Sequence, residues 1–273
     1  MMSDRLHEHG SAAPFKAPAE RLSHIDNIQR IFLKGVTVSP LLAAPFFDVK
    51  LIAIDWLHTM DLGVAHIFLG SLFDLVMGYF DGDLTAKTNT LWKHIQAYYK
   101  RTKVENQLQN FKPTMLQGKN HPKLRSKAGE TRSLIDFAVS ISKQVLDAAD
   151  PEARAATVAA QALQECYALL SRTRFRQQDM EDACNRFSAQ YVALSAWSEQ
   201  HGGRRWPLKP KFHLMQEMVY EATSSPADAW TYRDEGFGGV VAKWSLRRGG
   251  KYSPMSLGMS LFDRFSGQPL PDL

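Results

Sequence analysis

The chain has 273 residues, a hydrophobic fraction of 44% and a formal net charge of +5. This length allows one large domain or two small ones with a sizeable core, and the composition excludes a disordered or a fibrous protein. The small positive surplus favours an anionic partner without requiring one, so the position of the charges matters more than their sum.

The sequence shows no export, membrane or disulfide signal. The amino-terminal segment carries charged residues where a secretory signal needs an apolar core. The most apolar long segment, Val64–Phe80, is interrupted by polar residues and is shorter than the roughly 20 residues of a membrane span. Cys166 and Cys184 lie in helix-like sequence without a CxxC pair, which favours buried thiols. We therefore expect an intracellular protein that does not associate with membranes.

The first elements of the chain lead to a junction at Asp55. Residues 1–18 are polar and rich in small side chains, which predicts disorder. Helical spacing follows over Ala19–Leu33, and a loop with two prolines then leads to a short apolar run, Leu51–Ile54. An apolar run that gives way to 3.6-residue spacing predicts a buried strand feeding a helix, here continuing to Phe80.

Asp55 and His58 stand at this predicted strand-to-helix junction. Catalytic groups collect at the carboxyl ends of strands in open α/β sheets, which makes both residues candidate site residues. The alternatives are structural: Asp55 caps the following helix by accepting a backbone N–H, and His58 is a core histidine with satisfied ring nitrogens. We expect Asp61, farther along the same helix, to be a surface acid.

The segment Lys93–Arg132 is strongly basic. It holds ten Lys or Arg residues and two acids, so its net charge of +8 exceeds that of the whole chain. A helix is predicted over Thr90–Tyr99, and the prolines and glycines farther along predict that much of the segment is a mobile loop between helices. Such a cluster can neutralise phosphates and bind nucleic acid in a salt-dependent way, with little sequence preference; the alternative is a solvated connector. The ten candidate nucleic-acid-binding residues are Lys93, Lys100, Arg101, Lys103, Lys112, Lys119, Lys123, Arg125, Lys127 and Arg132.

Three helices are predicted over Thr131–Gln200. The first carries an apolar face through Val145. The second begins at Asp150-Pro151, an N-cap residue followed by proline, and reaches Leu170. The third ends at Gly202-Gly203. These apolar stripes are typical of a core rather than of a cofactor site.

The last part of the chain contains two further predicted helices. The first runs from about Lys211 to Ala222, and the second follows a Ser-Pro loop and carries Trp244 on its apolar face. Asp234 and Glu235 suit the positive amino-terminal end of that second helix, which gives Glu235 a structural explanation.

Two separated sequence blocks resemble those of a known family. The first, IDWLHTMDLGVAHIFLG, resembles the D-x-x-H … L-G-V block of eukaryotic CACTA-type (En/Spm-like) transposases and their transposase-derived relatives. The second, KPKFHLMQEM … WTYRDEGFGGVVAKW, looks like the K-x-H-x-x-x-E/H helix and the E-x-F-x-G motif of the same family. The resemblance spans Asp48–Lys243, but only the two blocks carry it.

The resemblance implies an RNase H-like, DDE-type core in which three acidic residues hold two Mg²⁺ or Mn²⁺ ions for DNA strand cleavage and transfer. Glu235 matches the final acid and would be a metal ligand. Asp55 and His58 match the D-x-x-H pair that accompanies the triad. The first two acids should precede Asp55, where Asp26 and Asp48 match no motif. We therefore expect a truncated or domesticated descendant that is inactive because the upstream catalytic acids are absent. If it is active, the resemblance implies a metal-dependent nuclease or transposase.

The predicted fold is mainly α with a small β component, a truncated RNase H-like core that carries a large helical insertion. Its predicted parts are a disordered amino terminus (1–18), a partial core (19–80), a helical insertion with the basic loop (81–205), and returning core helices with a tail (206–273). The predicted function is electrostatic DNA binding, which implies a nuclear location, with possible residual nuclease or strand-transfer activity. The alternative is a helical protein-interaction module built on Thr131–Gln200. If the site is functional, Asp55, His58 and Glu235 should converge within roughly 4–8 Å.

Overall fold

The computed structural model describes residues 53–232, 236–239, 242–243 and 259. The chain divides into two compact units, residues 1–230 and 231–273. In the second unit, residues 236–239 and 242–243 are helical, in agreement with the helix predicted there. The predictions for residues 1–18 and for Ala19–Leu33 fall outside the described residues, and so does Glu235.

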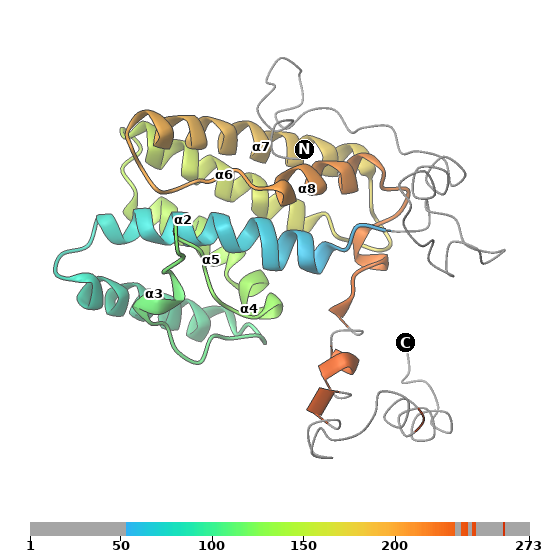
Figure 1. Ribbon diagram of the computed structural model, residues 1–273, viewed down its shortest axis with the longest axis horizontal. Coiled ribbons are helices and arrows are strands. Elements are labelled where there is room, and N and C mark those ends of the chain that lie inside the picture. Colours follow the sequence, from blue (N-terminus) through green and yellow to red (C-terminus); the bar gives the residue numbers. More distant parts are fainter. Residues whose placement is uncertain (1–52, 233–235, 240–241, 244–258, 260–273) are drawn as a thin grey trace, which may run out of the picture. The chain divides into compact units, whose positions relative to one another are not determined.

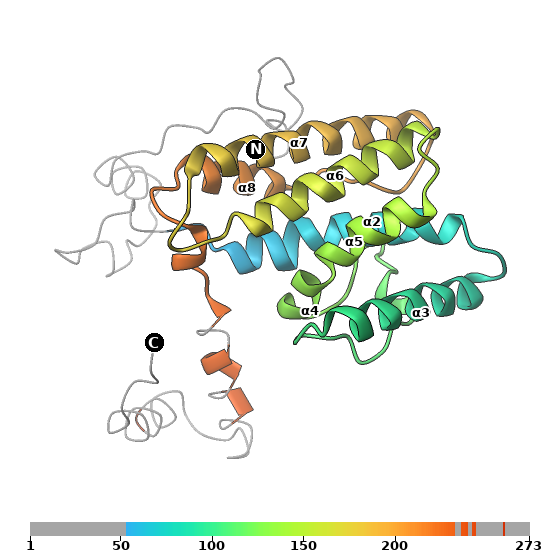
Figure 2. The ribbon, with the colours of Figure 1, turned by 180° about the vertical axis from the view of Figure 1, so that it is seen from behind.

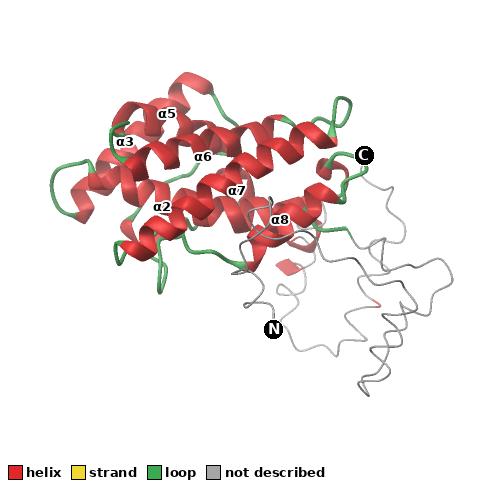
Figure 3. Ribbon diagram, turned by 90° about the horizontal axis from the view of Figure 1, so that it is seen from above, coloured by secondary structure: helices red, strands yellow, loops and turns green. Residues whose placement is uncertain are grey.

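Every regular element in the described part of the chain is a helix (Figure 3), which confirms the mainly α prediction. The predicted strand is not found there: residues 53–55 have no regular structure and a helix begins at Trp56. A strand needs a neighbour to pair its N–H and C=O groups, and within the described residues no second strand offers one. The two residues of the predicted strand that the structure describes, Ala53 and Ile54, are therefore not in a strand, and Leu51 and Ile52 lie outside the described residues.

A long central helix organises the first unit. The π-helix η4 (Leu57–Val64) continues directly into the α-helix α2 (Ala65–Gly78). Twelve of the fourteen α2 residues are buried, so this helix is apolar on all sides because it is packed on all sides. By length and composition, Leu57–Gly78 could also cross a membrane, but most of it is buried inside the molecule, as in the core helix of a folded domain.

The other helices surround the central one (Figures 1 and 2). They are α3 (Leu84–Thr102), η5 (Pro113–Met115), α4 (Ala128–Ser133), α5 (Ile135–Val145), α6 (Pro151–Ala168), α7 (Gln177–Gln200), α8 (Pro210–Tyr220) and η6 (Pro226–Asp228). Helices α6 and α7 pack together, α5 packs on α6 and α2, and α8 packs on α7 and η4. These helices share one hydrophobic core, and the division into core (19–80), insertion (81–205) and return (206–273) stays a prediction about ancestry.

Local signals place the helix ends where the sequence predicted them. The side chain of Asp150 accepts a hydrogen bond from the Glu152 N–H at 2.9 Å and Pro151 opens α6. At the end of α7, Gly202 has a φ of 63°, a left-handed conformation that favours glycine. The Gly203 N–H then returns to the Ser198 carbonyl at 2.7 Å, which satisfies a terminal carbonyl of the helix.

A polar network closes the end of the core that joins α2, α6 and the α7–α8 connection. The Glu152 carboxylate, 8% exposed, accepts two hydrogen bonds from Arg205 at 2.8 and 2.9 Å and one from the Trp206 indole at 2.7 Å. Arg205 also donates to Asp74 on α2 at 3.1 Å. The charges are paired in a fork geometry, which is what burial of a carboxylate requires.

Candidate functional site

Asp55 caps the central helix. Its carboxylate accepts the backbone N–H of Leu57 at 3.3 Å and that of His58 at 2.9 Å. These are the second and third helical N–H groups after Asp55, which have no partner within the helix. The structural interpretation of Asp55 is confirmed, and the cap holds its carboxylate at a fixed position.

The same carboxylate contacts the His58 ring. Asp55 Oδ2 lies 2.5 Å from His58 Nδ1, and the His58 side chain is 58% exposed. His58 is therefore not a core histidine. A carboxylate on Nδ1 fixes the tautomer and orientation of an imidazole, which is how histidines are prepared for proton transfer or ligand contact.

The two resembling sequence blocks meet in space at Lys211. Its Nζ, on α8, donates a hydrogen bond to the His58 carbonyl at 2.6 Å. A Cβ on Gly63 would collide with the Lys211 side chain, so the glycine lets the lysine cross the helix. Burial lowers the pKa of Lys211, Lys123 lowers it further, and Asp55 opposes this shift. The convergence of Asp55 and His58 with Glu235 stays a prediction because Glu235 lies outside the described residues.

Asp61 was expected on the surface, and that prediction is wrong. Its side chain is 0% exposed and accepts a hydrogen bond from the Tyr167 hydroxyl of α6 at 2.7 Å. The residue lies in the π-helix η4. A helical wheel with 3.6 residues per turn places Asp61 on the same face as the buried Leu57, Val64 and Phe68. The prediction failed because it followed the charge of the residue and not its position.

The basic segment is partly helical. Its first part, through Thr102, belongs to α3, which confirms the helix predicted over Thr90–Tyr99. The connection that follows is attached to the core through isolated apolar side chains. These buried side chains are Leu108, Phe111, Leu116 and Leu124. Sequence reasoning missed them because three of the four have polar neighbours on both sides and the four together follow no helical or strand period.

Most of the ten predicted cations are available to a partner. Eight are exposed, while Lys123 and Arg132 are partly buried. No ion pair to any of the ten occurs among the described residues. Arg132 is engaged differently, because its guanidinium lies 4.8 Å from the ring centre of Trp230 and 5.8 Å from that of Tyr167.

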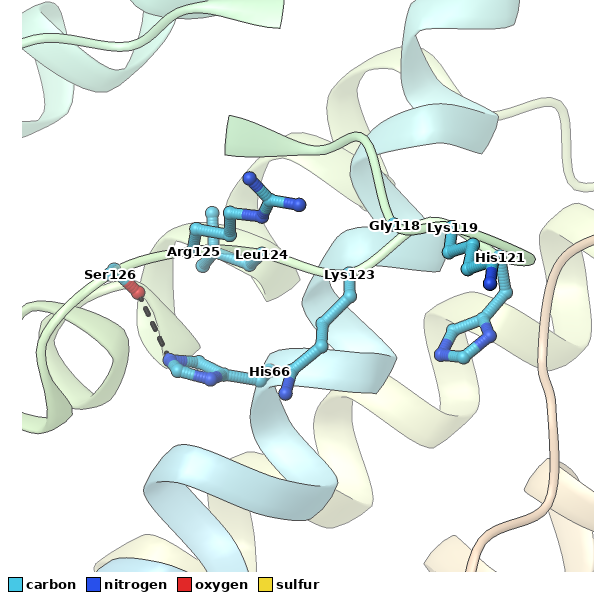
Figure 4. A pocket seen from close by; sticks show the side chains of 8 residues that line it. All are labelled: His66, Gly118, Lys119, His121, Lys123, Leu124, Arg125 and Ser126. Atoms are coloured by element: carbon cyan, nitrogen blue, oxygen red, sulfur yellow. Dashed lines mark hydrogen bonds between the residues drawn. The ribbon is translucent and has the colours of Figure 1, made fainter. Parts of the chain in front are cut away.

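Three of the cations line a pocket of about 490 Å³ (Figure 4). Its walls are formed by the connection before α4 and by one residue of α2. The lining residues are His66, Gly118, Lys119, His121, Lys123, Leu124, Arg125 and Ser126. Figure 4 shows the Lys123 side chain between the two histidine rings, with Arg125 on the other side of the loop.

Direct backbone contact with α2 holds this loop in place. The Leu124 N–H donates to the His66 carbonyl at 2.9 Å. A Cβ on Gly70 would lie 2.5 Å from Lys123 Cα and 2.6 Å from Leu124 N, so only glycine fits at this point of α2. The His66 ring also hydrogen-bonds the Ser126 hydroxyl, with 3.3 Å between Nε2 and Oγ.

The pocket is electropositive. Burial, followed by Lys123 and then Lys211, lowers the pKa of His66 to about 4, although a hydrogen bond to Ser126 acts in the opposite direction. His66 is therefore neutral at pH 7. The positive charge of the pocket resides on its lysines and arginine, and no carboxylate is among the lining residues.

Burial and positive charges also lower the pKa of a second histidine of the pocket, His121. Burial lowers the pKa of His121, and Lys209, Lys123 and Arg204 lower it further. Lys209 and Arg204 come from the α7–α8 connection, about eighty residues from the pocket loop in sequence. Cations from two distant parts of the chain therefore act on one pocket.

The described residues supply part of a metal site at most. Within them, no group of three His, Cys, Asp or Glu side chains is arranged to hold an ion. Asp55 and His58 offer two donors, and the predicted third, Glu235, lies outside the described residues. Binding of Mg²⁺ or Mn²⁺ stays a prediction.

Comparisons with protein-family models, with curated proteins and with solved structures found no match to this chain.

Proposed function

We propose that this protein binds DNA through the phosphate backbone, using the basic segment Lys93–Arg132, with weak sequence preference. The observation that carries the proposal is the exposure of eight cations on one segment, none paired with a carboxylate in the described part of the chain. Exposed, unpaired cations release the counterions of a nucleic acid when they contact its phosphates.

The salt dependence of binding gives the first test. For duplex DNA, the logarithm of the binding constant should fall with the logarithm of salt concentration with a slope of about −0.9 for each phosphate contacted. Four contacts would give a slope of about −3 to −4. Binding that is insensitive to salt, or salt-insensitive association with a protein, would favour the interaction-module alternative.

Charge-neutralising variants give the second test. Replacing Lys93, Lys100 and Lys112 by glutamine should weaken DNA binding and make the slope shallower by about 1 for each phosphate that the protein no longer neutralises. A matched control replaces three exposed cations outside the segment, Lys143, Arg154 and Arg174, by glutamine. Equal losses of affinity in both variants would show that only net charge matters, against a dedicated interface.

The ancestry proposal is that the chain descends from a CACTA-type transposase and keeps a reduced RNase H-like core. It is supported by the contact between the two resembling blocks, in which Lys211 crosses Gly63 and reaches the His58 carbonyl. If Glu235 lies beside Asp55 and His58, Mg²⁺ or Mn²⁺ would stabilise the attacking and leaving oxygens of a phosphoryl displacement. Asp55 would then keep His58 in one tautomer near the phosphate.

Catalysis is tested separately from binding. Metal-dependent DNA cleavage that Glu235→Gln abolishes, with folding and DNA binding retained, would support the catalytic role. Loss of folding in Glu235→Gln would instead support its role at a helix end. A protein that binds DNA in the nucleus without cleaving it would be a domesticated, non-catalytic descendant.

A further inference from the structure

The pocket formed by His66 and residues 118–126 is distinct from the rest of the basic surface because it is recessed and its walls are fixed. We propose that this pocket receives the terminal phosphate monoester of a nucleic-acid strand. The inference deepens the proposed function and rests on it for the nature of the partner. The remaining exposed cations of the segment would contact the phosphodiesters that follow the strand end.

The charge of the pocket fits a dianion. Lys119, Lys123 and Arg125 line it without a compensating carboxylate. Lys209 and Lys211 add to the positive field from α8 and the connection before it. A terminal phosphate carries about −1.5 to −2 charges at pH 7, whereas each phosphodiester carries one, so the monoester gains more from the same cations.

The size and shape of the pocket fit a strand end. Its volume of about 490 Å³ lies within the range of pockets that enclose a small ligand. All lining residues belong to one short loop and one residue of α2, so the pocket is a local recess. A strand end needs only to enter such a recess, whereas an uninterrupted backbone must also leave it.

The pocket walls are organised before a ligand binds. The Lys123 N–H donates to the Leu116 carbonyl at 3.1 Å, and the Arg125 N–H donates to the Met115 carbonyl at 2.8 Å. A Cβ on Gly118 would collide with the His121 carbonyl, so the turn at this position also requires glycine. A loop fixed in this way loses little conformational entropy when its cations bind a ligand.

The neutral polar groups complement the cations. The Ser126 hydroxyl contacts both the His66 ring at 3.3 Å and the Thr131 hydroxyl at 2.7 Å. The His66 ring and the Ser126 hydroxyl lie along one wall, and groups of both types can donate or accept a hydrogen bond. Phosphate oxygens accept several hydrogen bonds at once, so such a wall suits them better than it suits a halide ion.

The decisive experiment compares strand ends on the whole protein. Single-stranded DNA of one sequence is prepared with a 5′-phosphate, a 3′-phosphate or hydroxyls at both ends, and binding is measured by fluorescence anisotropy. We expect one phosphorylated end to bind about 10-fold more tightly than the hydroxyl strand, which corresponds to about 1.4 kcal/mol. Inorganic phosphate and a nucleoside monophosphate should remove this preference by competition.

Two variants test whether the preference for a phosphorylated strand end arises in the pocket. Lys123→Gln should abolish the preference for a phosphorylated end. Lys112 is an exposed cation of the same segment outside the pocket, so Lys112→Gln should lower the affinity for all strands and leave the preference unchanged. The His121 ring resonances report occupancy independently, because a bound dianion should raise the pKa of His121 in the wild type and not in Lys123→Gln.

The outcomes separate the two proposals. Salt-dependent binding that is equal for phosphorylated and hydroxyl ends overturns the terminal-phosphate inference and leaves the proposed function intact. A preference that Lys123→Gln and Lys112→Gln reduce equally also overturns it, since the pocket would not be the site. If inorganic phosphate binds in the pocket formed by His66 and residues 118–126 but no DNA binds to the protein, nucleic acid is not the partner and the proposed function is wrong as well.

Discussion

Replacing Gly70 by alanine perturbs the contact that seats the basic loop on the central helix. In an ordinary helix interior, Gly→Ala stabilises by about 1 kcal/mol. Here the new methyl would lie 2.5 Å from Lys123 Cα and 2.6 Å from Leu124 N, both backbone atoms that cannot rotate away. Overpacking of this kind costs about 1–3 kcal/mol.

The loop must move, and its hydrogen bond to the helix breaks with it. The bond from the Leu124 N–H to the His66 carbonyl, 2.9 Å long, contributes about 1 kcal/mol. Adding this loss to the overpacking cost and subtracting the gain in helix propensity, we expect Gly70→Ala to destabilise the protein by about 1–3 kcal/mol. DNA binding at the pocket should weaken as well, because Lys123 moves with the loop.

Gly78→Ala in the same helix is the matched control. A Cβ on Gly78 meets nothing within 4 Å, so this variant should be neutral or stabilising by up to about 1 kcal/mol. Urea unfolding followed by tryptophan fluorescence measures both variants, with an unchanged m-value as the sign of a common unfolded state. If Gly70→Ala is as stable as Gly78→Ala, the loop does not lie against α2 and the pocket does not form in this way.

Three further predictions concern stability. Glu152→Gln removes the charge that holds Arg205 and should lower the free energy of urea unfolding by about 2–4 kcal/mol. Glu165 forms a half-exposed ion pair with Arg186, so Glu165→Gln should cost less than about 1 kcal/mol. Equal costs would show that the buried network does not stabilise the fold. The pKa of His66 is about 4 in the folded state and 6.5 in its ordinary state, so the free energy of unfolding should be highest above pH 6.5 and fall by about 3 kcal/mol towards pH 4. This loss should be absent in His66→Gln. Identical pH profiles of the wild type and the variant would contradict the prediction. Asp55→Ala should lower the free energy of unfolding by about 1 kcal/mol because the cap is removed, while Asp55→Asn should keep nearly full stability because the amide oxygen can still cap the helix. Thermal unfolding of both variants tests this. An equal loss in both would show that the charge of Asp55, and not its role as a cap, is needed for folding.

Local patterns determined most of the helices. The Asp150-Pro151 start and the Gly202 end are set by backbone chemistry within a few residues, namely the unpaired N–H and C=O groups of a helix end. The density of cations in Lys93–Arg132 is likewise a property of the sequence. These features could be predicted because each depends on neighbours in the chain.

The tertiary structure decided the rest, because those features depend on distant residues. The run before Asp55 looked like a strand, but pairing between strands is not a local property, and the described residues offer none. Asp61 can be buried because Tyr167, 106 residues away, stabilises its carboxylate by donating a hydrogen bond. Lys119, Lys123 and Arg125 line a pocket because Gly70 lets the loop backbone contact α2. No periodicity or composition in the sequence reveals this contact.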